Sequence, residues 1–486
     1  MGGAAGIKVL MGMIGVKFAA VLIGATGIGL LATLTAVLGL IVTLAGLGIQ
    51  TSAVRDIAIA VASDNPQAVS RKVHAVKRLC WITGLIGMLV ALVLSPLISQ
   101  VTFGHAEYRY EIAILGIAIL FANLSSGQMA LIQGMRRIGD LALINIVSAM
   151  IGTLASVALY ATFGLRGIAP ALVAIAAIQL ALSWHYARQL PVLNADLSWR
   201  DTFTEASGMV RLGLVFMWSS LMVSAVIFVT VALITQQQGL PAVGLYSAAF
   251  ALSGAFVSFV LGAMGADYYP RLTAMAHDEP AMCRLVNEQT EIGLLLALPG
   301  LLATLALAPW AIRLLYTPEF LGAVVLLQWF ILGCLGRVIS WPLGFVMLAL
   351  GKGRWFFVIE TGANLFHVAL VALGLFWFGV EGVAVAFFVL YLGYIVATYL
   401  VSRYLIGFRW SIACTRLAML GLPPLLLTFV AVRWLPLWPA TVVGCLLTIA
   451  VSVYALRSLV QRIGHDHRIF RLVGKVPGAK ALCGLT

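Results

Sequence analysis

Long apolar runs alternate with short polar or glycine-rich stretches from one end of the chain to the other. A helix needs about 20 consecutive apolar residues to cross a hydrocarbon core about 30 Å thick. The runs do not alternate between apolar and polar positions as barrel strands do, so they predict membrane-spanning helices. Fourteen runs are long enough, and they lie near residues 7–25, 28–54, 79–99, 111–133, 141–163, 166–187, 209–235, 241–265, 291–312, 322–350, 354–378, 380–402, 413–433 and 438–458.

The composition is that of an integral membrane protein. Of the 486 residues, 62% are hydrophobic and 10% are charged, and the mean hydropathy is +1.06. Soluble proteins carry about 45–50% apolar and about 25% charged residues, so this chain has too few charges to cover a water-facing surface. A soluble enzyme and a free nucleic-acid-binding protein are therefore excluded. The first run contains Lys17 and no small-residue cleavage site follows it, which predicts a first span rather than a removed signal peptide.

The positive charges are distributed unevenly between the two sides of the predicted topology. The formal net charge is +13, and most Lys and Arg residues fall in the even-numbered loops and at the two termini. Because cytosolic loops carry the excess of Lys and Arg, we expect both termini in the cytosol. The basic balance therefore reflects topology and a weak attraction to anionic lipids, and it indicates no nucleic-acid partner. The odd-numbered loops hold only Arg109, Arg166, Arg313 and Arg433.

No arrangement of residues indicates catalysis, a metal site or a cofactor. His465 and His467 lie in a basic tail without further ligands, and the glycines of 24–29 join two spans rather than follow a strand. A membrane-embedded polymerase or glycosyltransferase would need a catalytic loop rich in polar residues, whereas the outward loops are short and nearly chargeless. The cysteines have no metal-ligand spacing and are expected to be structural thiols: Cys80, Cys283, Cys334, Cys414, Cys445 and Cys483.

The sequence repeats itself at a constant shift of 215 residues. The matches fall at the same places relative to the predicted spans, which makes a chance origin difficult even in a glycine-rich chain. Each copy contains six spans, and an even number gives both copies the same orientation in the membrane. The matched positions are Gly29 with Gly244, Gly39 with Gly254, 163–169 with 378–384, and Arg188 with Arg403.

The repeat predicts an all-α polytopic membrane protein of about fourteen transmembrane helices. We expect two pseudo-symmetric six-helix bundles, at residues 1–206 and 207–404, and a third region at 405–486 with two extra C-terminal helices and a basic cytosolic tail. Parallel repeats of this kind are typical of transporters in which one bundle rocks against the other around a site near the midplane.

Four stretches of the sequence, in order, also carry a family resemblance. Together they resemble the O-antigen flippases, in the polysaccharide-transport branch of the multidrug/oligosaccharidyl-lipid/polysaccharide (MOP) exporter superfamily. The resemblance covers about residues 5–405. It implies a MATE-like fold and a protein that carries lipid-linked oligosaccharide units across the bacterial inner membrane. The stretches are 47–58 (LGIQTSAVRDIA), 131–142 (LIQGMRRIGDLA), 243–249 (VGLYSAA) and 261–272 (LGAMGADYYPRL).

Three ionisable residues lie inside predicted spans, where a charge costs about 2.5–3.5 kcal/mol on insertion scales and therefore faces a cavity or a partner. At a rise of about 1.5 Å per residue, Lys17 and Arg337 fall near the midplane and Glu360 lies nearer one end of its span. We interpret Lys17 and Arg337 as an anion-binding site in a central cavity that Glu360 also lines. The alternative is a structural ion pair between Arg337 and Glu360.

Further polar and aromatic residues are candidates for the transport path or for the closure of its cytosolic mouth. The path candidates, which could equally be helix-packing or kinking residues, are Asn123, Gln128, Gln133, Trp341 and Pro342. The candidates for a cytosolic gate closed by salt bridges between the bundles are Arg55, Asp56, Asp267 and Arg271. The alternative for this second group is membrane anchoring together with pairing at helix ends.

The charges and the resemblance together predict a flippase that takes a polyprenyl-pyrophosphate-linked oligosaccharide from the cytosolic to the outer leaflet. A multidrug cation antiporter of the same superfamily is the alternative, but it needs acidic residues in the membrane interior, and spans one and seven contain none. Membrane lipids, a polysaccharide polymerase or chain-length complex, and a coupling proton or sodium ion are the partners that this interpretation implies.

Overall fold

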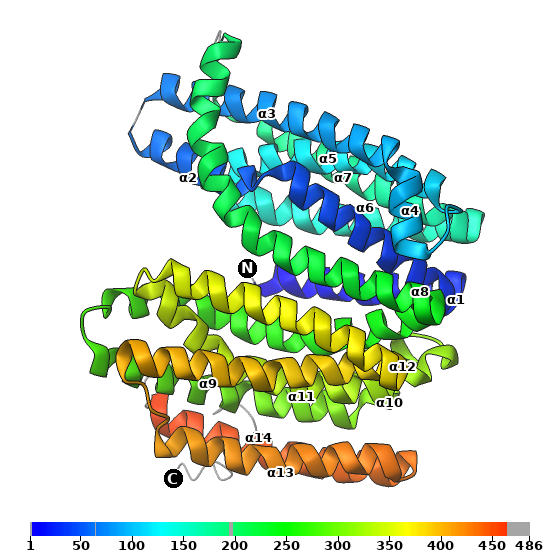
Figure 1. Cartoon of the computed structure of the whole chain (residues 1–486), viewed down its shortest axis with the longest axis vertical. Coiled ribbons are helices and arrows are strands. Elements are labelled where there is room, and N and C mark those ends of the chain that lie inside the picture. The colour runs from blue at the N-terminus through cyan, green and yellow to red at the C-terminus, as the bar shows by residue number, and fades with distance from the viewer. Residues whose placement is uncertain (1, 64, 194–197, 464–486) are drawn as a thin grey trace. The chain divides into compact units, whose positions relative to one another are not determined.

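The structure is a computed structural model that describes residues 2–63, 65–193 and 198–463. All regular elements within these ranges are helices, and the ranges contain no strand. The elements, labelled in Figure 1, are α1 (Gly2–Gly46), α2 (Ile49–Ala62), α3 (Pro66–Val93), α4 (Ser95–Phe103), α5 (Arg109–Gly134), α6 (Ile138–Phe163), η1 (Gly164–Gly167), α7 (Ile168–Ala187), α8 (Trp199–Ala274), α9 (Glu279–Ala306), α10 (Ala308–Leu315), η2 (Pro318–Gly322), α11 (Ala323–Ala349), α12 (Gly353–Ile406), α13 (Ile412–Trp434) and α14 (Leu437–Ile463).

Ten helical stretches of the described residues are long and apolar enough to cross a membrane. Four of them are longer than one crossing, and each of these four contains one backbone break, at Gly24, Gly164, Gly239 or Gly379. Each break divides its stretch into two helical segments. The prediction of an all-α polytopic membrane protein is thus confirmed.

The breaks recur at the shift found in the sequence. Gly24 has φ 63° and ψ −168°, and its match Gly239 has φ 81° and ψ 172°. Gly164 has φ 55° and ψ −131°, and its match Gly379 has φ 58° and ψ −147°. Only glycine adopts such conformations without strain, so each break depends on the absence of a side chain. The backbone of the two halves is locally matched at these points, while the symmetry of the whole bundles stays a prediction.

The order of elements also repeats along the chain. Helices α3 and α9 each span 28 residues, and each is followed by a short helix, α4 or α10. The Asn65 side chain caps α3 by accepting the Ala68 N–H at 3.0 Å, and the Asp278 side chain caps α9 by accepting the Ala281 N–H at 2.9 Å. A side-chain acceptor at this position satisfies one of the free N–H groups of the first turn. The same local chemistry therefore starts both helices.

The second predicted run, 28–54, is not one helix. Helix α1 ends at Gly46, and Leu47 and Gly48 have φ values of 47° and 63° before α2 begins. A Cβ atom on Gly48 would lie 2.0 Å from the carbonyl oxygen of Gly213, so the turn is also a close approach of two backbones. Hydropathy alone does not detect this turn, because the residues on both sides of it are apolar.

The chain forms two compact units, which are described separately. Unit 1 contains Met1–Gly244 together with Leu315–Glu319, and unit 2 contains Leu245–Leu314 together with Phe320–Thr486. In unit 1, α5 packs against α3 and α7; in unit 2, α9 packs against α11, α13 and α14. Unit 1 extends beyond the repeat boundary expected near residue 206, because the first part of α8 packs with the N-terminal helices.

Side-chain contacts hold the first turns of α8 against α3. The Glu205 carboxylate pairs with Lys72 at 2.7 Å and with Arg71 at 3.4 Å, both on α3. On the same face of α3, Arg78 donates to the Thr202 hydroxyl at 2.8 Å. These contacts fasten the beginning of α8 to unit 1.

Within unit 1, α1 and α8 cross at two of the glycines that the repeat matched. A Cβ atom on Gly29 would lie 1.9 Å from the Leu240 carbonyl oxygen, and one on Gly244 would lie 2.3 Å from the Ala25 carbonyl oxygen. Helices in membranes approach closely where small residues meet. The helix crossing therefore requires glycine at both matched positions, because Gly29 on α1 contacts α8 and Gly244 on α8 contacts α1.

Candidate functional site

Lys17 lies on the first segment of α1, seven residues before the break at Gly24, which is about 10 Å of helix. Its ammonium group is half-buried and donates to the carbonyl oxygen of Tyr316 at 2.7 Å. The helix begins at Gly2, earlier than the predicted run at residue 7. Lys17 is therefore nearer the Gly24 end of its segment than the sequence estimate of a midplane position indicated.

The segment Leu315–Glu319, which holds Tyr316, belongs to unit 1 although the helices on either side of it belong mainly to unit 2. Two contacts fasten this segment to α1. One is the Lys17 hydrogen bond to Tyr316, and in the other the Glu319 carboxylate accepts the N–H of Ala25 at 3.4 Å. Tyr316 is 4% exposed. Sequence reasoning missed this contact, because it joins residues about three hundred positions apart.

In unit 2, Arg337 and Glu360 do not form the ion pair that was the alternative interpretation; none joins them within the described part of the chain. The Glu360 carboxylate instead accepts a hydrogen bond from the Tyr394 hydroxyl at 2.5 Å. Arg337 and Glu360 both lie in the neighbourhood of the Tyr391 hydroxyl. The cluster thus contains a half-buried cation, a carboxylate and two tyrosines contributed by α11 and α12. The two tyrosines lie three residues apart on α12, so helical spacing was the available sequence signal.

The polar path candidates have different surroundings. Asn123 is 2% exposed, and its side-chain amide donates to the Ile119 carbonyl at 3.0 Å. Gln133 is exposed near the end of α5. Trp341 is half-buried in unit 2, where its ring lies 4.7 Å from that of Phe345 and 5.6 Å from that of Tyr268. Asn123 and Trp341 are therefore packed within their own units.

The proposed gate residues lie near helix ends. Arg271 pairs with Asp267 one turn earlier on α8, at 3.2 Å. Arg55 is exposed and Asp56 is half-buried on α2, and neither forms an ion pair among the described residues. The pairing seen at Asp267 and Arg271 is the helix-end pairing of the alternative interpretation. A gate that joins the bundles stays a proposal.

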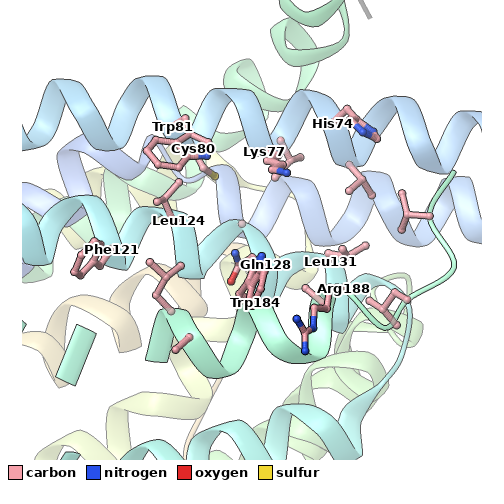
Figure 2. Close-up of a pocket in the computed structure, with 18 of the residues that line it drawn as sticks. His74, Lys77, Cys80, Trp81, Phe121, Leu124, Gln128, Leu131, Trp184 and Arg188 are labelled. Atoms are coloured by element: carbon pink, nitrogen blue, oxygen red, sulfur yellow. The ribbon is translucent and has the colours of Figure 1, made fainter. Parts of the chain in front are cut away.

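Unit 1 contains a cavity of about 920 Å³ between α3, α5 and α7 (Figure 2). Of the sequence candidates, Gln128 lines it. Its two cations are Lys77 and Arg188. The sequence identified them only as charges that indicate topology, because nothing in their spacing shows that they line the same cavity. Trp81 and Trp184 also line the cavity. We refer to it below as the unit 1 cavity.

Residues 2–276 match the model of the family described as polysaccharide biosynthesis protein. This match covers more than half of the chain. The chain belongs to this family. Among curated proteins, it is similar to the lipid III flippase of Escherichia coli (strain K12), with 24% identity over 368 residues, which are 73% of this chain and 85% of the relative. The lipid III flippase of Shigella flexneri matches to the same extent.

Solved structures of MOP-superfamily transporters show the same fold. An inward-facing multidrug resistance MATE transporter of that superfamily matches with a TM-score of 0.69 and 15% identity, covering 82% of this chain and 94% of its own. The lipid II flippase MurJ, in an inward closed conformation, matches with a TM-score of 0.66 and 11% identity, covering 94% of this chain and 98% of its own. The MATE-like architecture implied by the sequence resemblance is thereby confirmed.

Proposed function

We propose that this protein moves a polyprenyl-pyrophosphate-linked oligosaccharide, an O-antigen or similar repeat unit, from the cytosolic to the outer leaflet of the bacterial inner membrane by alternating access. Membership of the polysaccharide biosynthesis family supports a sugar-containing substrate. Similarity to proteins named lipid III flippase supports a lipid-linked one. The distribution of Lys and Arg supports a topology with both termini in the cytosol.

The observation that carries the proposal is the sign of the charges within the spans. Lys17 on α1 and Arg337 on α11 are half-buried cations in helices of otherwise apolar sequence. A cation inside a membrane protein is costly unless it meets an anion or water. A pyrophosphate headgroup supplies such an anion, and Lys17 and Arg337 are the cations proposed to bind it. Trp341 and Gln133, which keep exposed surface, are proposed to meet the sugar, and Asn123, which is buried and bonded to Ile119, would have to become exposed during transport to do so.

A multidrug cation antiporter is supported less well. Such a protein needs free carboxylates in its interior, and neither the first segment of α1 nor the apolar part of α8 up to Gly239 supplies one. Glu360 is the carboxylate closest to Arg337 in sequence among the spans, and it already accepts the Tyr394 hydroxyl. The geometry therefore favours an anionic substrate.

The membrane potential offers a driving force for such a substrate. Moving one elementary charge through the field changes the free energy by about 2.3 kcal/mol per 100 mV. A headgroup with about two negative charges would gain about twice that amount on leaving an inside-negative compartment. A coupling proton or sodium ion is then not required. A polysaccharide polymerase or chain-length complex would take the product at the outer leaflet.

The proposal predicts that both cations are needed for export. In a bacterium whose own O-antigen flippase is deleted, the wild-type chain should restore surface polysaccharide, while Lys17→Ala and Arg337→Ala should abolish it because the anion loses its partner. Lys17→Arg should keep part of the activity, and Lys17→Glu should be worse than Lys17→Ala. The measurement is surface polysaccharide divided by the amount of protein in the membrane.

Lys352→Ala is the matched control, because Lys352 is an exposed cation in the turn between α11 and α12. Glu319→Ala tests whether Lys17 acts only by fastening Leu315–Glu319, since it removes the second contact of that segment with α1. Full polysaccharide display by both alanine variants at Lys17 and Arg337 would contradict the proposal. Equal loss in Glu319→Ala would assign Lys17 a structural role.

A further inference from the structure

The unit 1 cavity presents hydrogen-bond donors to its interior and no carboxylate. The 20 residues that line it include Lys77 and Arg188 but neither Asp nor Glu. His74 and Gln128 add an imidazole and an amide. In Figure 2, Lys77 on α3 and Arg188 just after α7 lie on opposite sides of the group of labelled side chains. A pocket with this lining selects an anion over a cation or a neutral ligand.

Lys77 differs from its basic neighbours on α3. Arg71 and Lys72 pair with Glu205, and Arg78 donates to Thr202. The Lys77 ammonium group forms no ion pair and no hydrogen bond with any residue that the structure describes. The acid of this region pairs with residues outside the cavity, and Lys77 is an exposed cation that can reach a ligand at the cavity.

Arg188 is held in place without losing its charge. Its guanidinium lies 4.6 Å from the centre of the Trp184 ring and 3.4 Å from the His185 imidazole nitrogen. Stacking on an aromatic face positions a guanidinium while leaving its N–H groups able to bind phosphate. Arg188 forms no ion pair with a described carboxylate, so it too can receive an anion.

Gln128 on α5 adds a hydrogen-bond donor between α3, which carries Lys77, and the end of α7, which precedes Arg188. The Ser183 hydroxyl donates to the Gln128 amide oxygen at 2.6 Å. That contact occupies the amide oxygen, and the amide NH₂ group remains able to donate a hydrogen bond to a ligand in the cavity.

The rest of the lining is apolar and reaches the membrane-facing surface. Phe121, Leu124 and Leu180 are among the apolar residues of the wall. Trp81 and Trp184 are 45% and 55% exposed, which places two indole rings at the rim. Tryptophan is enriched at the membrane–water interface, and the topology of Lys and Arg assigns this end of α3 and α7 to the cytosolic side. The rim therefore lies where lipid headgroups are.

We propose that the unit 1 cavity binds an anionic phospholipid of the cytosolic leaflet. Its phosphate lies between Lys77 and Arg188 and accepts a hydrogen bond from Gln128, and its acyl chain lies along the apolar wall of α5 and α7. Basic pockets between transmembrane helices on the cytosolic side are suited to anionic headgroups. A phospholipid is the occupant rather than a free phosphate because the wall beside the two cations is apolar and suits an acyl chain. Lipid bound here would brace α3, α5 and α7 against one another.

Native mass spectrometry of the purified full-length protein tests this proposal without transport. Short-chain phosphatidylglycerol and phosphatidylcholine are titrated separately, with inorganic phosphate as a third probe. We expect phosphatidylglycerol to bind more tightly than phosphatidylcholine, and free phosphate not to compete, since it lacks the chain. Lys77→Gln combined with Arg188→Gln should weaken phosphatidylglycerol binding about 30-fold, as expected for two lost lipid-facing cations.

The matched control is Lys352→Gln combined with Arg354→Gln, which removes two exposed cations outside the cavity and should leave binding unchanged. Ala181→Trp provides a second test if the double variant fails to fold. It fills the cavity while keeping both charges, and should weaken binding of both lipids. Equal affinity of the wild type for the two lipids would overturn the proposal, as would equal loss in the control pair. Binding of polyprenyl phosphate without binding of phosphatidylglycerol would also overturn it.

Discussion

Glu360 places a carboxylate in an apolar helical segment, and the group that stabilises it is a tyrosine hydroxyl rather than a cation. The bond from Tyr394 joins the two segments of α12 on either side of the Gly379 break. Arg337 is left without an ion pair among the described residues, which is what an anion-binding role requires. The cost of a charge inside a membrane made Lys17, Arg337 and Glu360 predictable from the sequence. Their contacts were not predictable, because backbone carbonyls and tyrosine hydroxyls carry no distinguishing pattern in an apolar sequence.

Replacing Tyr394 with Phe should destabilise unit 2. The change removes the donor and leaves the Glu360 carboxylate desolvated, which costs about 1–3 kcal/mol for a buried polar group. Thermal unfolding of the purified protein in detergent measures this as a lower midpoint. Tyr399→Phe is the control, since Tyr399 is a half-buried tyrosine on the same helix that does not bond to a carboxylate. Equal midpoints for the two variants would show that the Glu360 contact contributes nothing.

Glycines interrupt several helices of this protein, and their backbone conformations are ones that other residues do not adopt without strain. The apolar runs predicted where helices lie, and the 215-residue shift predicted that positions recur. The sequence did not show that Gly24 and Gly239 would be the breaks rather than the other glycines near them. It also did not show that Leu47 and Gly48 end α1, because that turn depends on the approach of Gly213 from α8. Contacts between distant parts of the chain determine these features.

Gly24→Ala and Gly239→Ala should have the same effect on stability. Each places a side chain at a positive φ with extended ψ, a strain of about 1–3 kcal/mol. Gly12→Ala and Gly254→Ala are the controls within α1 and α8, because a Cβ atom at either position meets nothing within 4 Å. These controls should be neutral or slightly stabilising, as alanine favours a helix over glycine. Thermal midpoints in detergent give the comparison, and a tolerated alanine at Gly24 would contradict the assigned break.

At the scale of the whole molecule, the chain combines two compact units with unlike interior chemistry. Unit 1 holds Lys17 and a cavity lined by donors, and unit 2 holds Arg337 in a tyrosine-rich cluster. The all-helical membrane fold and the family could be predicted from the sequence, since both rest on long runs and ordered motifs. The extent of unit 1 could not, because it depends on contacts of α8 with α1, such as Thr33 with Thr235 and Thr43 with Ser224, and on the Leu315–Glu319 segment. The proposed transport of an anionic lipid-linked sugar would give the cations of both units a common role.

The most direct test is to measure the movement of a pyrophosphate-linked oligosaccharide across the bilayer of proteoliposomes that contain the purified protein. The sugar is labelled, and its accessibility to an impermeant quencher is followed over time without a proton or sodium gradient. The account predicts protein-dependent movement that becomes faster when the potential drives anions out of the loaded leaflet, and that is lost in Lys17→Ala and Arg337→Ala. Movement no faster than in protein-free vesicles, with and without the potential, would contradict it.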